Sequence, residues 1–304
     1  MMRLSDLSDD EIVGKLKGDG LALRTGPFIM RLYSPLALIH EGIATLYRDY
    51  PLGDEDGFSD FHVSVEPAPG LRHWFKPQVA FSFDGWSAFN TLPKAQALPL
   101  MEWGLNWCAN VHGHHFLILH AAAIEKAGRV AILPAPPGSG KSTLCAGLVH
   151  RGWRLFSDEL ALISLVDGSV SPLVRPVSLK NKSIDVIKGF ASDSVFSAPV
   201  HDTGKGTVAL MKAPTDSVLR KHDRDAPAWV IFPRYEEGAE ARFTARSKGQ
   251  TCIEVGSNAI NYSPLGQKGF MALTRLIDQC DCYDFVYGNL DQAEAAFAGL
   301  EPPA

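Results

Sequence analysis

The sequence predicts an α/β fold, with a mixed-sheet core that begins near residue 115 and a smaller α+β lobe before it. Short stretches of alternating apolar and polar residues, typical of half-buried strands, fill much of the first hundred residues. Strand-like apolar runs then alternate with helical patterns, which is the arrangement of α/β domains. We therefore place a boundary after residue 112, with an N-terminal α+β accessory lobe at 1–112 and the core domain at 113–304.

The elements of the lobe follow from its turn residues and its periodicity. In chain order we expect an amphipathic helix at 1–16, strands at 20–34 and 61–67 with a helix at 35–50 between them, a hairpin at 78–93 around Asp84-Gly85, and a helix at 97–114. The lobe carries no motif that we can assign. Substrate recognition, oligomerisation and simple covering of the core sheet are therefore all open roles for it.

The core is expected to begin with two strands in a hairpin and to end with a short helix. In chain order we expect strands at 116–125 and 129–135, a helix at 141–151 that ends at Gly152, a strand at 153–157, a hairpin at 160–176 around Asp167-Gly168, a loop-rich region at 175–228, strands at 228–235 and 242–247, helices near 249–260 and 266–280, a strand at 283–288 and a helix at 290–300.

Composition excludes several classes of partner. A net charge of -5 and a pI near 6.1 give no basic surface for DNA or RNA, so we expect no nucleic-acid partner. Apolar stretches such as 98–111 are interrupted too early to span a bilayer, and the N-terminus lacks the apolar segment of a signal peptide. We therefore expect a cytoplasmic protein that does not enter a membrane. Five scattered cysteines without a CxxC pair predict neither a disulfide framework nor a zinc site.

The stretch "RVAILPAPPGSGKS" at 129–142 has the features of a phosphate-binding loop. Gly138, Gly140, Lys141 and Ser142 match the pattern G-x-x-x-x-G-K-[ST], with Ala135 in place of the first glycine. In such loops backbone N–H groups converge on phosphate oxygens, the lysine reaches the terminal phosphates and the hydroxyl binds Mg²⁺. The alternative is a Gly/Ser-rich turn that merely caps a helix. We expect the nucleotide contacts at Pro137, Gly138, Ser139, Gly140, Lys141, Ser142 and Thr143.

Two acidic residues follow the next strand. Asp158 is expected at the carboxyl end of that strand, where ligands bind in open α/β sheets, so it can face the phosphates from beside Ser142. A carboxylate there either holds Mg²⁺ or takes the proton of an attacking hydroxyl. Glu159 would point differently on an extended chain, so the two acids need not share a role. An acidic turn or helix cap is the alternative interpretation.

Residues 119–163, "LHAAAIEKAGRVAILPAPPGSGKSTLCAGLVHRGWRLFSDELALI", resemble the core of the HPr kinase/phosphorylase family. Members have a histidine before the loop, a glycine-rich GKS loop and a strand that ends in paired aspartates. The resemblance implies a P-loop kinase core with a mixed sheet like that of phosphoenolpyruvate carboxykinase. Later stretches, among them "RPVSLKNKS", "HDTGKGTVALM", "FPRY" and "NYSPLGQKGF", look like the divergent branch called HPr-related kinase A.

The resemblance also implies roles for individual residues. It places Lys141 on the phosphates as a catalytic residue, makes Asp158 the general base, and makes His120 a neighbour that supports this acid. Ser142, Asp158 and Glu159 would hold the metal. The chain departs from the family pattern at Ala121, Ala135, Thr143 and Glu159, where the family has glycine, glycine, an acid and aspartate.

Three basic residues after the core strands are further candidates for contacts with phosphate or substrate. Lys180, Lys205 and Arg175 lie in the region expected to be rich in loops, and a cation there can neutralise a γ-phosphate during transfer. Solvated surface lysines are the alternative. The glycines on both sides of Lys205 favour a mobile loop that closes over substrate.

Together these residues predict a kinase that uses ATP and Mg²⁺. It is expected to transfer the γ-phosphoryl group to a hydroxyl, in particular that of serine, on a protein or peptide acceptor. A kinase of a small serine-like metabolite and a nucleotide-binding switch without catalysis are the alternatives. By analogy with the family, a homo-oligomer is expected.

Overall fold

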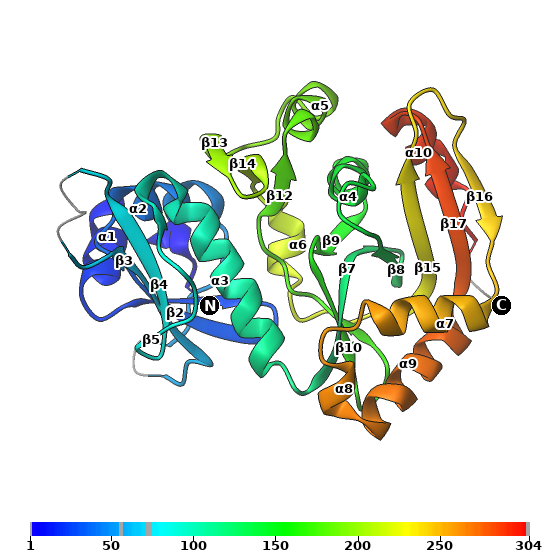
Figure 1. The fold of residues 1–304 in the computed structure, drawn as a ribbon, viewed down its shortest axis with the longest axis horizontal. Coiled ribbons are helices and arrows are strands. Elements are labelled where there is room, and N and C mark those ends of the chain that lie inside the picture. The colour runs from blue at the N-terminus through cyan, green and yellow to red at the C-terminus, as the bar shows by residue number, and fades with distance from the viewer. Residues whose placement is uncertain (1, 55–56, 71–74, 302–304) are drawn as a thin grey trace.

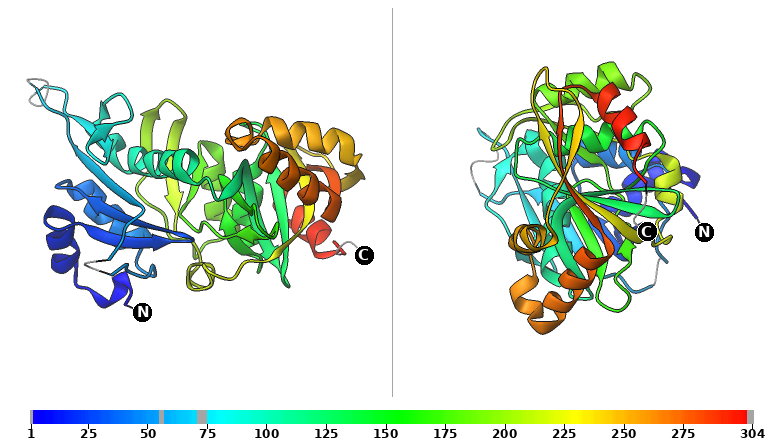
Figure 2. Two further views of the ribbon diagram at one scale, coloured as in Figure 1. Left: turned by 90° about the horizontal axis from the view of Figure 1, so that it is seen from below. Right: turned by 90° about the vertical axis from the view of Figure 1, so that its right-hand side faces the viewer.

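The computed structural model describes residues 2–54, 57–70 and 75–301, and it confirms an α/β protein with mixed parallel and antiparallel sheets (Figures 1 and 2). Figure 1 places the N-terminal lobe at one end of an elongated molecule and the core at the other, with α3 between them. The predicted boundary at 112/113 falls at the end of α3 (Ala97–His112).

The N-terminal lobe is a six-stranded sheet with helices packed on it. Its strands pair in the order β1-β2-β3-β4-β5, with β6 beside β4, and the pairing of β2 with β3 is parallel. The elements are η1 (Leu4–Asp6), α1 (Asp9–Lys17), β1 (Leu21–Thr25), β2 (Phe28–Tyr33), α2 (Ala37–Leu46), β3 (Phe61–Pro67), β4 (Gln78–Phe83), β5 (Trp86–Ser87), β6 (Leu92–Pro93), η3 (Lys94–Gln96) and α3.

The stretch at 20–34, predicted as one strand, is a hairpin of β1 and β2 that turns at Gly26. Gly26 has a φ of +58°, and a Cβ at this position would overlap the carbonyl oxygen of Pro172 in the core domain. Glycine is therefore required both for the turn and for the close approach of the two domains.

The core domain holds an eight-stranded sheet in the order β11-β10-β7-β8-β15-β17-β16, with β9 also paired to β7. The strands β8, β15 and β17 are parallel to one another, and the pairings of β7 with β8, β9 and β10 are antiparallel. The strands are β7 (Phe116–Lys126), β8 (Arg129–Pro134), β9 (Arg154–Ser157), β10 (Leu160–Ser164), β11 (Val170–Ser171), β15 (Ala226–Tyr235), β16 (Arg242–Ala245) and β17 (Asp281–Tyr287).

Helices cover both faces of this sheet. On one side, α4 (Lys141–Val149) and α10 (Leu290–Ala298) contribute to one core, and on the other α7 (Lys248–Ser257), α8 (Tyr262–Leu265) and α9 (Gln267–Gln279) contribute to a second; α7, α8 and α9 lie at the bottom of Figure 1. Residues of β7 enter opposite cores: Ile124 belongs to the core that contains Leu144 of α4, and Leu119 to the core that contains Leu273 of α9. This alternation follows from the two-residue repeat of a strand.

The region at 175–228, predicted to be rich in loops, instead forms a third sheet with two helices. The sheet has the order β12-β14-β13, and both of its pairings are antiparallel. Its elements are β12 (Val177–Lys180), α5 (Lys182–Phe190), β13 (Val200–Thr203), β14 (Gly206–Met211) and α6 (Thr215–Leu219). The strands were missed because they are short and because β12 pairs with a distant strand. Residues 181–205, which include α5, separate β12 from its partner β14.

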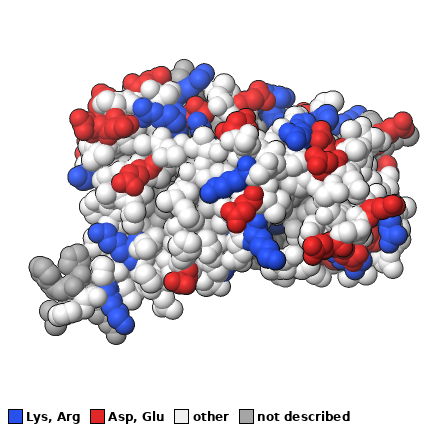
Figure 3. All heavy atoms as spheres, turned by 90° about the horizontal axis from the view of Figure 1, so that it is seen from above, with Lys and Arg blue, Asp and Glu red and all other residues white. Residues whose placement is uncertain are grey.

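Charged side chains of both signs are interspersed over the face that carries α5, with no large area of one sign (Figure 3). No helix in the described ranges has the length and apolar character needed to cross a bilayer.

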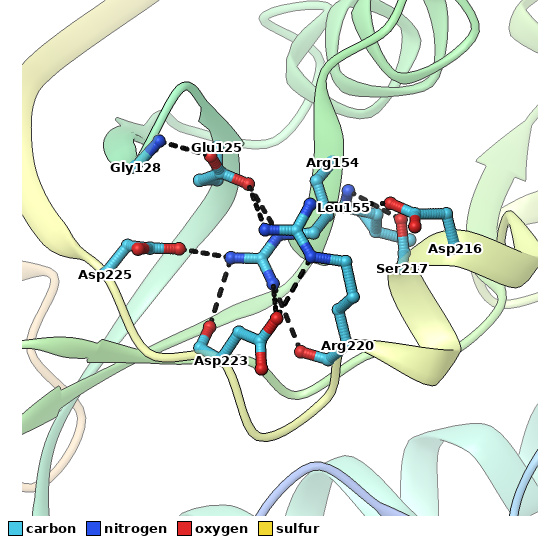
Figure 4. A network of polar contacts seen from close by, with 9 residues as sticks. All are labelled: Glu125, Gly128, Arg154, Leu155, Asp216, Ser217, Arg220, Asp223 and Asp225. Atoms are coloured by element: carbon cyan, nitrogen blue, oxygen red, sulfur yellow. Dashed lines mark hydrogen bonds and ion pairs between the residues drawn. The ribbon is translucent and has the colours of Figure 1, made fainter.

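Arg154 at the start of β9 forms a buried ionic network at the edge of the core domain (Figure 4). Its guanidinium donates to Glu125 at 2.6 Å and to the backbone carbonyls of Arg220 and Asp223 at 3.1 Å, and it pairs with Asp225. Arg154 and Glu125 are only 3% and 4% exposed. This network fixes the loop that leads into β15.

Replacing Arg154 with methionine should lower the free energy of unfolding by about 3–5 kcal/mol, because it leaves the buried Glu125 carboxylate without its closest cation. Arg224→Met is the matched control, since Arg224 pairs with Asp167 at 3.6 Å and both side chains are about half exposed. This control should cost less than about 1 kcal/mol. Equal losses for the two variants in denaturant titrations would contradict the structural role of Arg154.

Candidate functional site

The glycine-rich loop between β8 and α4 is held in place by the ends of two parallel strands. Tyr287 of β17 donates a hydrogen bond from its Oη to the carbonyl oxygen of Gly140 at 2.9 Å. The backbone N–H of Tyr235 at the end of β15 donates to the carbonyl oxygen of Ser139, also at 2.9 Å. Both bonds use carbonyl groups of the loop rather than its N–H groups, of which that of Ser139 donates to the carbonyl oxygen of Pro136 at 3.3 Å.

Gly138 and Gly140 carry the left-handed backbone of the loop, with φ values of +88° and +87°. A Cβ at Gly138 would meet open space, whereas one at Gly140 would overlap Tyr287 Oη and lie 2.9 Å from Tyr235 Cβ. Ala135 is buried at the end of β8, before these two turns. The alanine in place of the first glycine therefore does not occupy a left-handed position. Both left-handed positions of the loop, 138 and 140, are still glycine.

Gly140→Ala should impair nucleotide binding more than Gly138→Ala does. Both substitutions strain a left-handed backbone, at about 1–2 kcal/mol, but only the Cβ at Gly140 also displaces two tyrosines. We expect Gly140→Ala to lose at least tenfold more affinity for Mg·ATP, as measured by calorimetric titration. Similar affinities for the two variants would show that the tyrosine contacts do not set the shape of the loop.

The loop lines a cleft of about 570 Å³ on the carboxyl-end side of β8. Its lining combines the loop and the start of α4 with residues from β7, from the turn after β9 and from the third sheet. The lining residues are His120, Ala135, Pro136, Pro137, Gly138, Ser139, Gly140, Lys141, Ser142, Thr143, Glu159, Ser178, Lys180, Asn181, Ser183 and Lys205. All seven residues predicted to contact nucleotide lie here.

Lys141 places a cation in this cleft without a hydrogen-bond partner. The residue is 8% exposed, and its Nζ is buried with no acceptor in hydrogen-bonding range among the described residues. Burial lowers the pKa of Lys141, and the nearby Glu159 and Asp158 carboxylates oppose this shift. A buried ammonium without acceptors is costly, so this position suits an anionic ligand that would supply them.

The two predicted acids occupy different depths. Glu159 lines the cleft, whereas Asp158 lies behind the cleft surface, is 5% exposed, and accepts a hydrogen bond at Oδ2 from the Ser178 N–H at 2.8 Å. Asp158 was predicted to face the phosphates from beside Ser142, and in the structure it is buried and is not among the residues that line the cleft. The chain turns sharply between β9 and β10, so consecutive residues there point in different directions.

Burial and the neighbouring Glu159 charge raise the pKa of Asp158 to about 7. The pKa of Glu159 is lowered: burial raises it, but the charges of Lys141, Lys180 and His120 outweigh that effect. At neutral pH the Glu159 carboxylate is therefore ionised, whereas Asp158 titrates near pH 7. Pairs of carboxyl groups with separated pKa values are typical of acid–base sites.

The raised pKa of Asp158 makes the stability of the metal-free, nucleotide-free protein depend on pH. Its folded-state pKa lies above the unfolded value of about 3.9, so this group's contribution to stability is present below that value. It is lost as the pH rises through about 7. We therefore expect the difference in melting temperature, wild type minus Asp158→Asn, to become smaller or more negative as the pH is raised from 5 to 8. A constant difference between the two proteins would contradict the raised pKa.

His120 was predicted to support Asp158, but in the structure it lies beside Glu159. Its Nδ1 is 3.7 Å from Glu159 Oε2. The register of β7 explains this, since the backbone N–H of Ala121 donates to the carbonyl oxygen of Glu159 and His120 pairs with Leu160. Burial lowers the pKa of His120, as does the charge of Lys141.

Arg175 does not line the cleft, contrary to its prediction as a phosphate or substrate contact. Its side chain is buried and lies 3.6 Å from Glu102 of α3, whose other carboxylate oxygen accepts a hydrogen bond from Tyr47. Arg175 therefore serves the contact between the core and the lobe. Lys180 and Lys205, in contrast, both line the cleft as predicted candidates.

Three further lining residues, Ser178, Asn181 and Ser183, were not singled out from the sequence. Asn181 has a φ of +51° and a ψ of -129°, which is strained for a residue with a side chain. The only signal in the sequence is the polar stretch "SLKNKS" that follows Val177. Its significance depends on β12, which was itself missed.

The cleft has the chemistry to bind a phosphorylated ligand with Mg²⁺. The start of a helix, a buried lysine and the loop N–H groups suit phosphate oxygens. The Ser142 hydroxyl and the Glu159 carboxylate are oxygen ligands of the kind that Mg²⁺ takes alongside substrate phosphates. Within the described ranges there is no cluster of three or more His, Cys, Asp or Glu side chains suited to a metal.

Comparison with known proteins assigns no function to this cleft. The chain matches no protein-family model and no curated protein sequence.

Proposed function

We propose that this protein is a Mg²⁺- and ATP-dependent kinase that phosphorylates a hydroxyl, in particular that of serine, on a protein or peptide. The observation that carries this proposal is the buried Lys141 ammonium, which has no hydrogen-bond acceptor among the described residues and lies in a cleft with Glu159. A triphosphate would supply acceptors for this ammonium, and Glu159 in the cleft with Asp158 behind it would supply the carboxylates for the metal and the proton.

The arrangement of the core supports the kinase type that the sequence resembles. Three features are compatible with the HPr kinase and phosphoenolpyruvate carboxykinase type. The glycine-rich loop follows β8, the strands β8, β15 and β17 are parallel, and the strands on the other side of β8 are antiparallel. The resemblance between residues 119–163 and that family adds the order of histidine, loop and paired acids. Fold likeness alone does not establish activity, so the proposal depends on the cleft.

In the proposed reaction the loop and Lys141 hold the β- and γ-phosphates in one position. The acceptor oxygen attacks the γ-phosphorus, the bond from this phosphorus to the β–γ bridging oxygen breaks, and ADP leaves. The hydroxyl proton passes to Asp158, whose pKa of about 7 suits a base at neutral pH. Because Asp158 lies behind the cleft surface, this transfer requires one bridging water or entry of the hydroxyl beyond Glu159.

Glu159 and Ser142 would hold Mg²⁺, which when bound neutralises charge on the phosphates. A lowered pKa keeps Glu159 ionised at neutral pH, as a metal ligand must be. His120 lies against the Glu159 carboxylate, so it orients the proposed metal ligand rather than the proposed base.

A phosphotransfer assay tests the proposal. The protein is incubated with γ-labelled ATP and a library of serine-containing peptides, with and without Mg²⁺. We expect Mg²⁺-dependent label in phosphoserine, abolished by Lys141→Ala. Tight binding of Mg·ATP without label in any peptide or in free serine would instead favour a nucleotide-dependent switch.

A further inference from the structure

The wall of the cleft across from the phosphate loop is basic. Lys180 at the end of β12 and Lys205 in the turn between β13 and β14 line the same cleft as Lys141. Among the described residues, neither Lys180 nor Lys205 has a carboxylate within ion-pairing distance, and the Lys212 ammonium, in contrast, pairs with Asp49 at 2.8 Å. In Figure 3, charged side chains of both signs lie close together near the middle of the face that carries α5.

Local hydrogen bonds fix Lys180 in this wall. Its backbone N–H donates to Ser183 Oγ at 2.8 Å, and the same hydroxyl donates back to the Lys180 carbonyl at 2.6 Å. The strained Asn181 is held to β14, because its N–H donates to the carbonyl of Thr207 at 2.9 Å and its Oδ1 accepts from the Thr207 N–H at 3.1 Å. Strain kept by such bonds is typical of functional sites.

The N-terminal lobe holds Lys205. The Lys205 ammonium lies 5.1 Å from the centre of the Trp103 ring on α3, and Gln96 Nε2 donates to the Asp202 carbonyl at 2.9 Å. Within the turn, Thr203 Oγ1 accepts from the Lys205 N–H at 3.0 Å. The lobe therefore supports the turn that carries Lys205, although the lining residues of the cleft all come from the core domain.

The positive charge on this wall exceeds what the cleft itself neutralises. Glu159 is the one carboxylate among the lining residues, and its single charge is shared by three lysines, Lys141, Lys180 and Lys205, and by His120. The phosphate loop has its own N–H groups, its own lysine and the start of α4 for the triphosphate. Lys180 and Lys205 thus remain available for a second anion that approaches from the acceptor side.

We propose that the acceptor is acidic: it carries a carboxylate close to the hydroxyl that is phosphorylated, and Lys180 and Lys205 bind this carboxylate. This inference rests on the proposed kinase function. The carboxylate can belong to an aspartate or glutamate beside the serine, or it can be the free carboxylate at a peptide C-terminus or in serine itself. The chemistry is the same for each source, and an assay with matched acceptors separates them.

The test is a peptide library with one fixed serine, varied flanking residues and an amidated C-terminus, labelled with γ-labelled ATP. Matched peptides with a C-terminal serine as free acid or amide, and free L-serine, form the other arms. We expect the acidic member of a matched pair to have a kcat/KM at least about tenfold higher than its neutral counterpart. Equal rates for acidic and neutral acceptors would overturn the inference while leaving the kinase proposal intact. No labelled acceptor in any arm would contradict the kinase proposal itself.

Variants of the two lysines distinguish binding of the acceptor carboxylate from stabilisation of the γ-phosphate during transfer. Lys180→Met and Lys205→Met should each raise KM for acidic acceptors and reduce the preference for them, with little change for neutral acceptors and in KM for ATP. Lys182→Met is the control, since Lys182 is exposed at the start of α5 and does not line the cleft. If both lysine variants lower kcat equally for acidic and neutral acceptors, the lysines act on the γ-phosphate and the acidic-acceptor inference is wrong.

Discussion

Lys141→Met should weaken the binding of Mg·ATP by roughly 30- to 1000-fold, equivalent to about 2–4 kcal/mol. Lys141 Nζ is buried in the cleft with no acceptor among the described residues, so in the proposed complex we expect its hydrogen bonds to be made to phosphate. Methionine keeps an unbranched apolar side chain in the same space while removing the charge. Calorimetric titration with Mg·ATP measures the effect.

The same variant should leave the unliganded protein equally stable or more stable. Lys141 is 8% exposed, and a buried ammonium without hydrogen-bond acceptors opposes folding. Weaker binding together with an unchanged or higher melting temperature is the signature of a residue retained for its ligand. Lys182→Met provides the control for loss of one positive charge near the cleft. Unchanged affinity in Lys141→Met would rule out the phosphate loop as the nucleotide site.

Asp158→Asn should lower kcat for phosphotransfer by about 10²- to 10⁴-fold while affinity for Mg·ATP is retained. Asparagine preserves the shape of the side chain and can still accept from the Ser178 N–H, but it cannot take a proton at neutral pH. In the wild type, activity should rise with pH through the pKa of Asp158, which is about 7 in the unliganded protein. This rise should be absent in the variant.

Glu159→Gln is the paired variant, and it should act through the metal. It is expected to raise the Mg²⁺ concentration needed for half-maximal activity, because one of the proposed oxygen ligands loses its charge. If Glu159→Gln abolishes activity at every Mg²⁺ concentration while Asp158→Asn remains active, then Glu159 is the proton acceptor and the proposed roles are reversed.

The helices and the longer strands of the core could be predicted from the sequence because their signals are local. The glycine-rich loop, the helix after it and the strand that ends at Ser157 follow from residues within a few positions of one another. Gly138 and Gly140 were predicted in the loop, and the structure gives both a positive φ. Ala135, which weakens the match to the pattern, lies outside these left-handed turns.

On the other side of the cleft, Lys180 and Lys205 were predicted as candidate contacts, but the sheet that carries them could not be predicted because it depends on contacts between distant segments. The pairing of β12 with β14 brings Lys180 and Asn181 to the cleft, and the contact of Trp103 with Lys205 joins segments about a hundred residues apart. Likewise, the register of β7 against β10 places His120 beside Glu159 instead of Asp158. Short strands with distant partners have no pattern of their own that a single sequence reveals.

A crystal structure with Mg²⁺ and a non-hydrolysable ATP analogue tests the central claim most directly. We predict the β- and γ-phosphates on the backbone N–H groups of residues 138–142, Lys141 Nζ within hydrogen-bonding distance of a phosphate oxygen, and the γ-phosphate directed toward Glu159 and the wall that carries Lys180. Nucleotide bound elsewhere, or bound with Lys141 Nζ out of reach of every phosphate, would contradict the account.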